Sequence, residues 1–118
     1  MGGMRALDFK YNLNKPIELN ETDWYPWGYR GDKIAASRVE AWEFVVGGGA
    51  GFNHLNGLFT PGDPAGKSPD NERLLGALQN LKDFMYSFEF LKVHPDKSFI
   101  MSGLPASQAY SRGMSEPG

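Results

Sequence analysis

The alternation of hydrophobic and polar positions first predicts a short strand. Ile17 and Leu19 are apolar and their neighbours in sequence are polar, which is the two-residue period of a half-buried β-strand. This pattern ends on Glu21, and turn-forming residues follow it. We therefore expect a strand over residues 15–21 that ends on a carboxylate.

A helix is predicted between residues 33 and 46. Asp32 stands directly before this stretch, where its side chain can cap the first turn. Three glycines at 47–49 follow, and glycine accepts the left-handed backbone that commonly ends a helix. Four apolar residues lie four, three and four positions apart, as on one helix face. They are Ala35, Val39, Trp42 and Val46.

We expect this apolar face to be the buried side of the first helix. Trp42 is predicted to be a core residue because it sits within the helical spacing. Ser37, Glu40 and Glu43 lie mostly off this face, so we expect the packed interface to be apolar.

A second strand and a second helix are predicted after the glycines. Residues 50–55 form a short run that is expected to be a strand. Ser68 and Pro69 provide a favourable helix start, with the hydroxyl as N-cap and the proline at N1. The helix is expected over residues 68–90, with five apolar residues on one face. They are Leu74, Leu78, Leu81, Met85 and Phe88.

The order strand, helix, strand, helix predicts an α/β fold. The first connection is long enough for a right-handed crossover between parallel strands. Two parallel strands do not bury both of their faces, so we expect further strands to come from elsewhere. Residues 97–113 are expected to form short strands and turns, and the chain contains no internal repeat.

The composition is that of a globular protein, with 118 residues, 41% hydrophobic and 22% charged. A net charge of −2 gives no reason to expect nucleic acid or an anionic membrane as partner. No apolar run reaches the ~18–20 residues that span a bilayer. The absence of cysteine excludes thiolate sites, and the two histidines do not have metal-ligand spacing. Residues 1–5 lack the apolar stretch of a signal peptide.

The stretch from Gly62 to Ser68 contains Gly-Lys-Ser before a helix, as a phosphate-binding loop does. Its glycines are one residue too close together for that motif. Pro64 lacks an N–H donor, and Asp63 places negative charge where phosphates would lie. We therefore expect a loop that caps a helix rather than a nucleotide site.

Candidate chemistry lies where the two predicted strands end. Glu21 follows Asn20 and precedes a cluster of aromatic residues, and a carboxylate beside flat rings is typical of sugar-cleaving sites. Asn53 and His54 lie at the end of the second strand, which is the active face of a parallel barrel. The alternatives are an exposed loop glutamate, a histidine bonded to backbone and a hydrophobic cluster under a loop. The aromatic residues are Trp24, Tyr25, Trp27 and Tyr29.

Together these segments resemble the last two βα units of a glycoside hydrolase (β/α)8 barrel. The resemblance covers roughly residues 10–118 and rests on the order and spacing of four segments. It points to bacterial cellulase-like glycosidases, similar to apiosidase-type barrels, that carry a C-terminal β-domain once labelled collagen-binding. The segments are residues 15–21, Arg38-Val39-Glu40-Ala41-Trp42, residues 46–51 and Asn53-His54.

The resemblance implies that residues 1–96 are the C-terminal part of a TIM barrel and that residues 97–118 begin the β-domain, cut short at the end of the chain. Glu21 would be the nucleophile if the first strand is strand seven, or the acid/base if it corresponds to strand four. If Glu21 points into the barrel, Glu18 faces the helix layer and needs a partner there. The substrate, an oligo- or polysaccharide, would contact Asn20, Trp24, Trp27, Asn53 and His54.

Glycosidases need two carboxyl groups, and the resemblance places the second on a strand that this chain lacks. We therefore expect the chain to be inactive without the N-terminal part of the barrel, and no cofactor to be required. A secreted or periplasmic location is compatible with this function for the parent protein. The alternatives are a non-catalytic carbohydrate-binding domain and a protein-interaction domain that uses the apolar side of residues 74–88.

Overall fold

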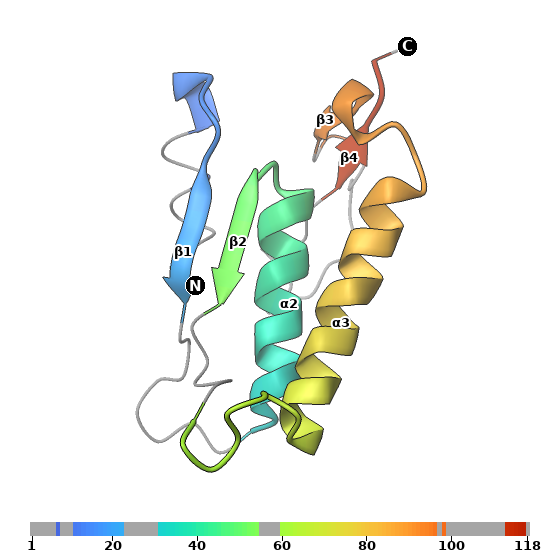
Figure 1. Cartoon of the computed structure of the whole chain (residues 1–118). Coiled ribbons are helices and arrows are strands. Elements are labelled where there is room, and N and C mark those ends of the chain that lie inside the picture. Colours follow the sequence, from blue (N-terminus) through green and yellow to red (C-terminus); the bar gives the residue numbers. More distant parts are fainter. Residues whose placement is uncertain are drawn as a thin grey trace.

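The protein is described here by a computed structural model. It covers residues 7, 11–22, 31–54, 60–96, 98 and 113–117, with the backbone alone described for residues 21, 22 and 54. Two strands form a small sheet, and helix α2 lies between this sheet and helix α3 (Figure 1). The described part is therefore a mixed α/β structure, as predicted.

The two strands of the first sheet run parallel, which confirms the predicted parallel pairing. Strand β1 spans Glu18–Thr22 and strand β2 spans Gly51–His54. Leu19 lies opposite Phe52, and Thr22 lies opposite His54. The register shifts between these two pairs, so β1 contains one residue more than β2 over the same length.

Helix α2 spans Lys33–Val46, which are the predicted bounds. The Asp32 side chain accepts hydrogen bonds from the N–H groups of Ile34 and Ala35, at 3.0 and 3.2 Å. At the other end Gly48 has a φ of +98°, the conformation for which glycine was predicted. The cap predicted at each end of this helix is therefore confirmed.

The carboxyl end of α2 is closed by a Schellman motif that also needs glycine for packing. The N–H groups of Gly48 and Gly49 donate to the carbonyl oxygens of Val45 and Phe44, at 3.0 and 2.9 Å. A Cβ at position 49 would lie 2.2 Å from a ring carbon of Phe44. The Phe44 ring is 1% exposed and its centroid lies 6.4 Å from that of Phe52 on β2. Phe44 thus joins the helix, its cap and the sheet.

The predicted buried face of α2 is wrong. The buried residues on this helix are Ser37, Glu40, Ala41 and Phe44. Val39, which was predicted to be buried, is 48% exposed, and Trp42 is only partly buried rather than a core residue. The sheet packs against the side of α2 that carries Phe44, because Phe44 meets Phe52 there. Apolar spacing alone did not identify that side.

Helix α3 spans Pro69–Tyr86, and the Ser68 hydroxyl accepts a hydrogen bond from the N–H of Asn71 at 3.4 Å. Its predicted apolar face is confirmed, because Leu74 and Leu81 are buried and its other members are partly buried. The helix ends four residues earlier than expected. Within the described residues, a 3-10 turn, η2 at Phe90–Lys92, follows it.

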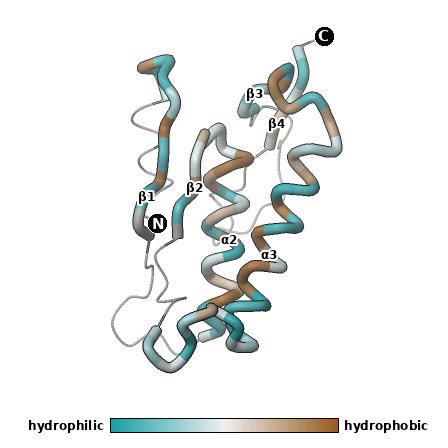
Figure 2. The backbone as a smooth tube through the Cα atoms, viewed as in Figure 1, coloured by the Kyte–Doolittle hydropathy of each residue, from teal (hydrophilic) through white to brown (hydrophobic). Residues whose placement is uncertain are grey.

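Figure 2 shows that apolar and hydrophilic turns alternate along both helices. No helix of the described segments is long and apolar enough to cross a bilayer. The remaining described elements are the 3-10 turn η1 at Tyr11–Leu13 and an antiparallel pair, β3 at His94–Pro95 and β4 at Met114–Ser115. Most of residues 97–113, for which strands and turns were predicted, lie outside the described residues.

Candidate functional site

The candidate site lies at the carboxyl ends of β1 and β2. Both strands end on the side of the molecule where α2 and α3 begin (Figure 1). This is the arrangement of a βα unit, in which residues at the strand ends lie beside helix N-termini. Three of the residues predicted to bind substrate, Asn20, Asn53 and His54, lie at these two strand ends.

Two of the predicted residues are in direct contact. The side-chain amide of Asn53 donates a hydrogen bond to the side-chain oxygen of Asn20, with an N–O distance of 2.6 Å. Both residues are exposed, and they are 33 positions apart in the sequence. The structure therefore brings together the polar ends of the two strands, as expected for parallel neighbours.

The asparagine pair lies on the sheet face turned away from α2. Leu19 and Phe52 are paired, and the Phe52 ring packs on Phe44 of α2. Successive strand residues point to opposite faces, so Asn20 and Asn53 occupy the other face. In a closed barrel, this face of the sheet lines the interior.

The irregularity in β1 falls at Asn20 and Glu21. These two residues lie opposite Asn53 alone, between the pairs of Leu19 and Thr22. Such a β-bulge interrupts strict alternation and re-aims side chains, and bulges are over-represented beside active sites. Alternation from Leu19 therefore does not fix the direction of residue 21, whose side chain lies outside the described part.

Glu18, which was expected on the helix side if Glu21 points into a barrel, does not face the helix layer. It lies opposite Gly51 and is exposed. Its Cγ is 3.2 Å from the position that a Cβ at residue 51 would take. Leu19 occupies the side of β1 toward α2. The surroundings of Phe52 on that side are apolar, which favours a leucine there over a carboxylate.

The other predicted site residues lie outside the described residues. Trp24 and Trp27 are in this group, together with the side chain of His54. Among the residues that are described, no three His, Cys, Asp or Glu side chains gather as a metal site would require. The described part of the site is therefore the asparagine pair on its bulged strand.

An exposed ion pair joins the starts of the two helices near this site. Arg73 of α3 contacts the Asp32 carboxylate at 2.8 Å, while that carboxylate caps α2. The hydrogen bond from Arg73, followed by that from the Ala35 N–H, holds the Asp32 pKa below its ordinary value. This ion pair therefore helps to hold the two helix N-termini together.

The loop before α3 caps that helix, as predicted. The carboxylate of Asp63 occupies the position that a bound anion would take. Asp63 accepts hydrogen bonds from the N–H groups of Lys67 and Ser68, at 2.8 and 2.7 Å. The Asn71 side chain donates a third at 3.1 Å. These bonds, the one from Lys67 first, lower the Asp63 pKa. The amides that a phosphate would need are therefore occupied.

Glu40 is a buried carboxylate that the sequence reasoning missed. It is 6% exposed, and neither side-chain oxygen has a hydrogen-bond partner among the residues that the structure describes. Burial, and to a lesser degree the charge of Glu43, raises the pKa of Glu40. Its position three residues after Ser37 and four before Phe44 places it on the buried face. That spacing was the available signal.

Comparison with known proteins gives no family for this chain. No family model, curated protein or solved structure matches it. The bond between Asn53 and Asn20 leaves the amide of Asn20 and the side-chain oxygen of Asn53 to act as donor and acceptor for a ligand. Such a pair suits a molecule with neighbouring hydroxyl groups.

Proposed function

We propose that the chain is the C-terminal part of a (β/α)8 glycoside hydrolase barrel, whose sugar-binding face includes the ends of β1 and β2. The observation that carries this proposal is the hydrogen bond between Asn20 and Asn53 on the face away from the helices. Supporting it, β1, α2, β2 and α3 follow one another as two βα units with parallel strands. The N-terminal part of the barrel would supply the remaining strands.

In this proposal Glu21 is one of the two carboxyl groups of the reaction, as nucleophile or as acid/base. The acid protonates the glycosidic oxygen of the leaving sugar while a carboxylate, or a water that it activates, attacks the anomeric carbon. The second carboxyl group would come from another strand, ~5–5.5 Å away in a retaining enzyme or ~6.5–9.5 Å in an inverting one. The carboxyl groups carry this chemistry without a cofactor.

The remaining residues would hold the sugar ring. The free amide hydrogens of Asn20 would donate to one hydroxyl, and the Asn53 oxygen would accept from its neighbour. Trp24 and Trp27 would stack on the apolar face of the ring, and His54 would contact a further hydroxyl. This division resembles that of other sugar sites, in which flat rings give contact area and amides give orientation.

Sugar binding can be tested with the 118-residue chain itself. In a proton–nitrogen NMR titration with cellotetraose, we expect the side-chain amide signals of Asn20 and Asn53 to move together and to saturate in the millimolar range. Asn20→Ala should weaken binding about 2- to 10-fold, because one hydrogen-bonding group is lost. The control is Asn12→Ala, which removes an exposed amide from η1. Unmoved asparagine signals would contradict the proposal.

Catalysis requires the remaining strands, so it is tested in a longer chain that carries them. There Glu21→Gln should abolish hydrolysis and spare sugar affinity, because the amide keeps the shape and loses the acid. Glu116→Gln is the control, since Glu116 is exposed near the end of the chain and should leave turnover intact. Equal loss of affinity with unchanged turnover would favour a non-catalytic carbohydrate-binding domain.

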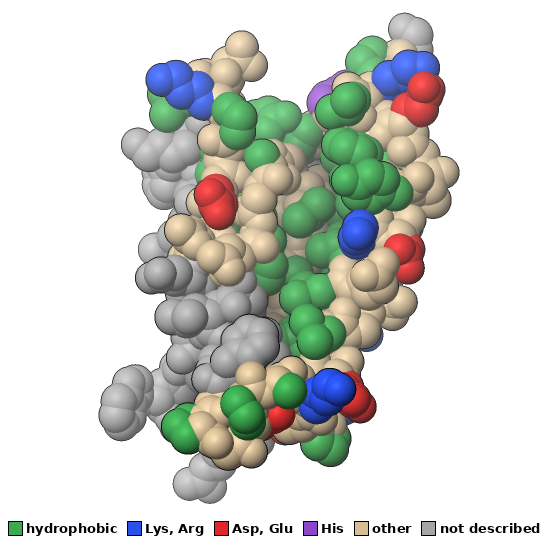
Figure 3. Space-filling view, in the orientation of Figure 1, with side chains coloured by type: hydrophobic (Ala, Val, Ile, Leu, Met, Phe, Trp, Pro, Cys, Tyr) green, Lys and Arg blue, Asp and Glu red, His purple; other side chains and the backbone are tan. Residues whose placement is uncertain are grey.

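One observation favours the protein-interaction alternative. An apolar cleft of about 620 Å³ lies at the carboxyl ends of the helices, and Phe84 and Phe88 contribute to its lining. Figure 3 shows hydrophobic side chains gathered between the helices and toward this end. However, Leu74 and Leu81 of α3 are buried within the chain itself. That burial weakens the view that the whole apolar side of α3 serves a partner.

A further inference from the structure

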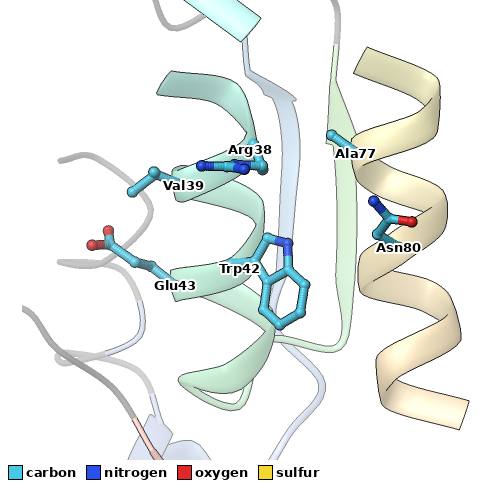
Figure 4. Close-up of a pocket in the computed structure, with 6 residues that line it drawn as sticks. All are labelled: Arg38, Val39, Trp42, Glu43, Ala77 and Asn80. Carbon is cyan, nitrogen blue, oxygen red and sulfur yellow. The ribbon is translucent and has the colours of Figure 1, made fainter. Parts of the chain in front are cut away.

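A separate cleft lies between the two helices, on the side of α2 opposite Phe44. It has a volume of about 340 Å³, at the lower end of the range for small-molecule sites. Trp42 and Arg38 lie on successive turns of α2, and side chains of α3 reach toward them (Figure 4). We infer that this cleft binds a neutral saccharide. The residues that line it are Arg38, Val39, Trp42, Glu43, Ala77 and Asn80.

One wall of the cleft is an aromatic ring that packs against a second ring. The Trp42 ring centroid lies 5.1 Å from that of Phe84, with the planes tilted by 43°. Trp42 nevertheless stays partly exposed and lines the cleft. An aromatic ring fixed by a second ring has little orientational freedom to lose on binding. It offers a flat apolar surface to the C–H face of a sugar.

The rim of the cleft supplies both donors and acceptors. Arg38 and Asn80 are exposed on the facing helices (Figure 4). A guanidinium only donates, and a carboxamide both donates and accepts. Neighbouring hydroxyl groups, each a donor and an acceptor, match this combination.

The charges of the rim favour a neutral ligand over an ion. Together with the cleft that adjoins it, the lining carries two cations, Arg38 and Arg73, and three anions, so neither sign dominates; the anions are Asp32, Glu43 and Glu72. A second cleft of about 420 Å³ shares Arg38, Ala77 and Asn80 with the first and continues toward Asp32 and Arg73. The two clefts thus form one groove, which has room for a disaccharide or a longer chain.

This inference goes beyond the proposed function, because it concerns the outer side of the helix layer and requires no hydrolysis. In a titration with either sugar the two sites report separately: the asparagine amides report the strand ends, and the Trp42 indole reports the groove. Failure at one site therefore leaves the result at the other readable.

The experiment is a proton–nitrogen NMR titration of the whole chain with cellobiose. The chain has three tryptophans, and the signal lost in Trp42→Phe identifies the Trp42 indole. We expect this signal to move and saturate in the millimolar range. Arg38→Ala and Asn80→Ala should each weaken binding about 2- to 10-fold, and both residues are exposed, so the fold should survive. Their controls, Lys82→Ala and Asn12→Ala, remove an exposed cation and an exposed amide elsewhere.

Two results would overturn the inference. The first is a Trp42 signal that cellobiose leaves unmoved, or a signal that moves in Arg38→Ala and Asn80→Ala as it does in the unsubstituted chain. The second is a signal that sodium acetate moves and cellobiose does not, which would make Arg38 an anion site instead.

Discussion

Helix α2 has two faces that differ in what they contact. The side toward the sheet is closed, and it buries Phe44 together with the polar residues Ser37 and Glu40. The opposite side carries Val39 and Trp42, and it remains partly open to solvent along the groove beside α3. A helix can therefore bury polar groups on the side that fixes the fold while it leaves an aromatic ring available for a ligand.

The largest expected effect comes from breaking the closed face. Phe44→Ala should lower the free energy of unfolding by about 3–5 kcal/mol, because it removes a buried ring from a packed site. Val39→Ala, on the open face, should cost less than about 1 kcal/mol. Urea denaturation followed by circular dichroism measures both. Equal costs would show that the two faces are packed alike.

A smaller effect of opposite sign is expected at Glu40. Glu40→Leu should raise the free energy of unfolding at pH 7 by about 1–3 kcal/mol, because it removes a buried acceptor that lacks a partner. Glu116→Leu is the control, since Glu116 is exposed near the end of the chain and should change stability little. Destabilisation by Glu40→Leu would show that the carboxylate is paired in solution.

The same residue predicts a pH dependence. Its pKa in the folded chain is raised above the ordinary value of 4.5, first by burial. The folded state then holds the proton more tightly than the unfolded state does, so stability falls as the pH rises from the unfolded pKa through the folded one. Glu40→Leu should remove this part of the slope. An unchanged slope between the two proteins in urea titrations would contradict the assignment.

The smallest expected effect is at the exposed helix start. Asp32→Ala should lower the melting temperature by about 3–6 °C, because α2 loses its cap and Arg73 loses its closest carboxylate. Asp70→Ala is the matched control, because Asp70 contacts the same arginine at 3.5 Å and caps nothing. Equal losses of melting temperature in Asp32→Ala and Asp70→Ala would assign the effect to the ion pair.

The interactions of Asp32 also predict a pH dependence. The pKa of Asp32 is lowered in the folded chain, so its contribution to stability is present above pH 3.8 and is lost as the pH falls through the folded pKa.

Local signals allowed three of the four helix boundaries to be predicted, and the end of α3 was missed. Asp32 and Ser68 each accept hydrogen bonds from nearby N–H groups, and Gly48 adopts a positive φ that ends α2. These interactions involve residues close in sequence, so the sequence around each boundary was enough to predict it. The parallel pairing of β1 and β2 followed from the helix between them. The barrel to which they are proposed to belong depends on strands outside the described residues, and it remains a proposal.

The site was predictable to the extent that it depends on strand ends. Asn20 was predicted from its place beside Glu21 and Asn53 from its place at the end of the second strand, and the two side chains meet. The bulge beside Glu21 was not predictable, since a two-residue period carries no information on the register between strands. Glu40 and Trp42 were misjudged for a related reason. The spacing of apolar residues describes a helix surface, and only the neighbouring sheet decides which part of it is covered.

The carboxylate of Asp63 has a consequence for the chemistry that this chain can acquire. It accepts hydrogen bonds from the backbone N–H groups of Lys67 and Ser68 just before α3, so these groups are not available to an anion from solution. Exchanging Asp63 for glycine would vacate this cradle and leave helix amides, together with Lys67, open to sulfate or phosphate. A single substitution would therefore change a turn whose amides bind its own carboxylate into a turn that can bind an anion from solution.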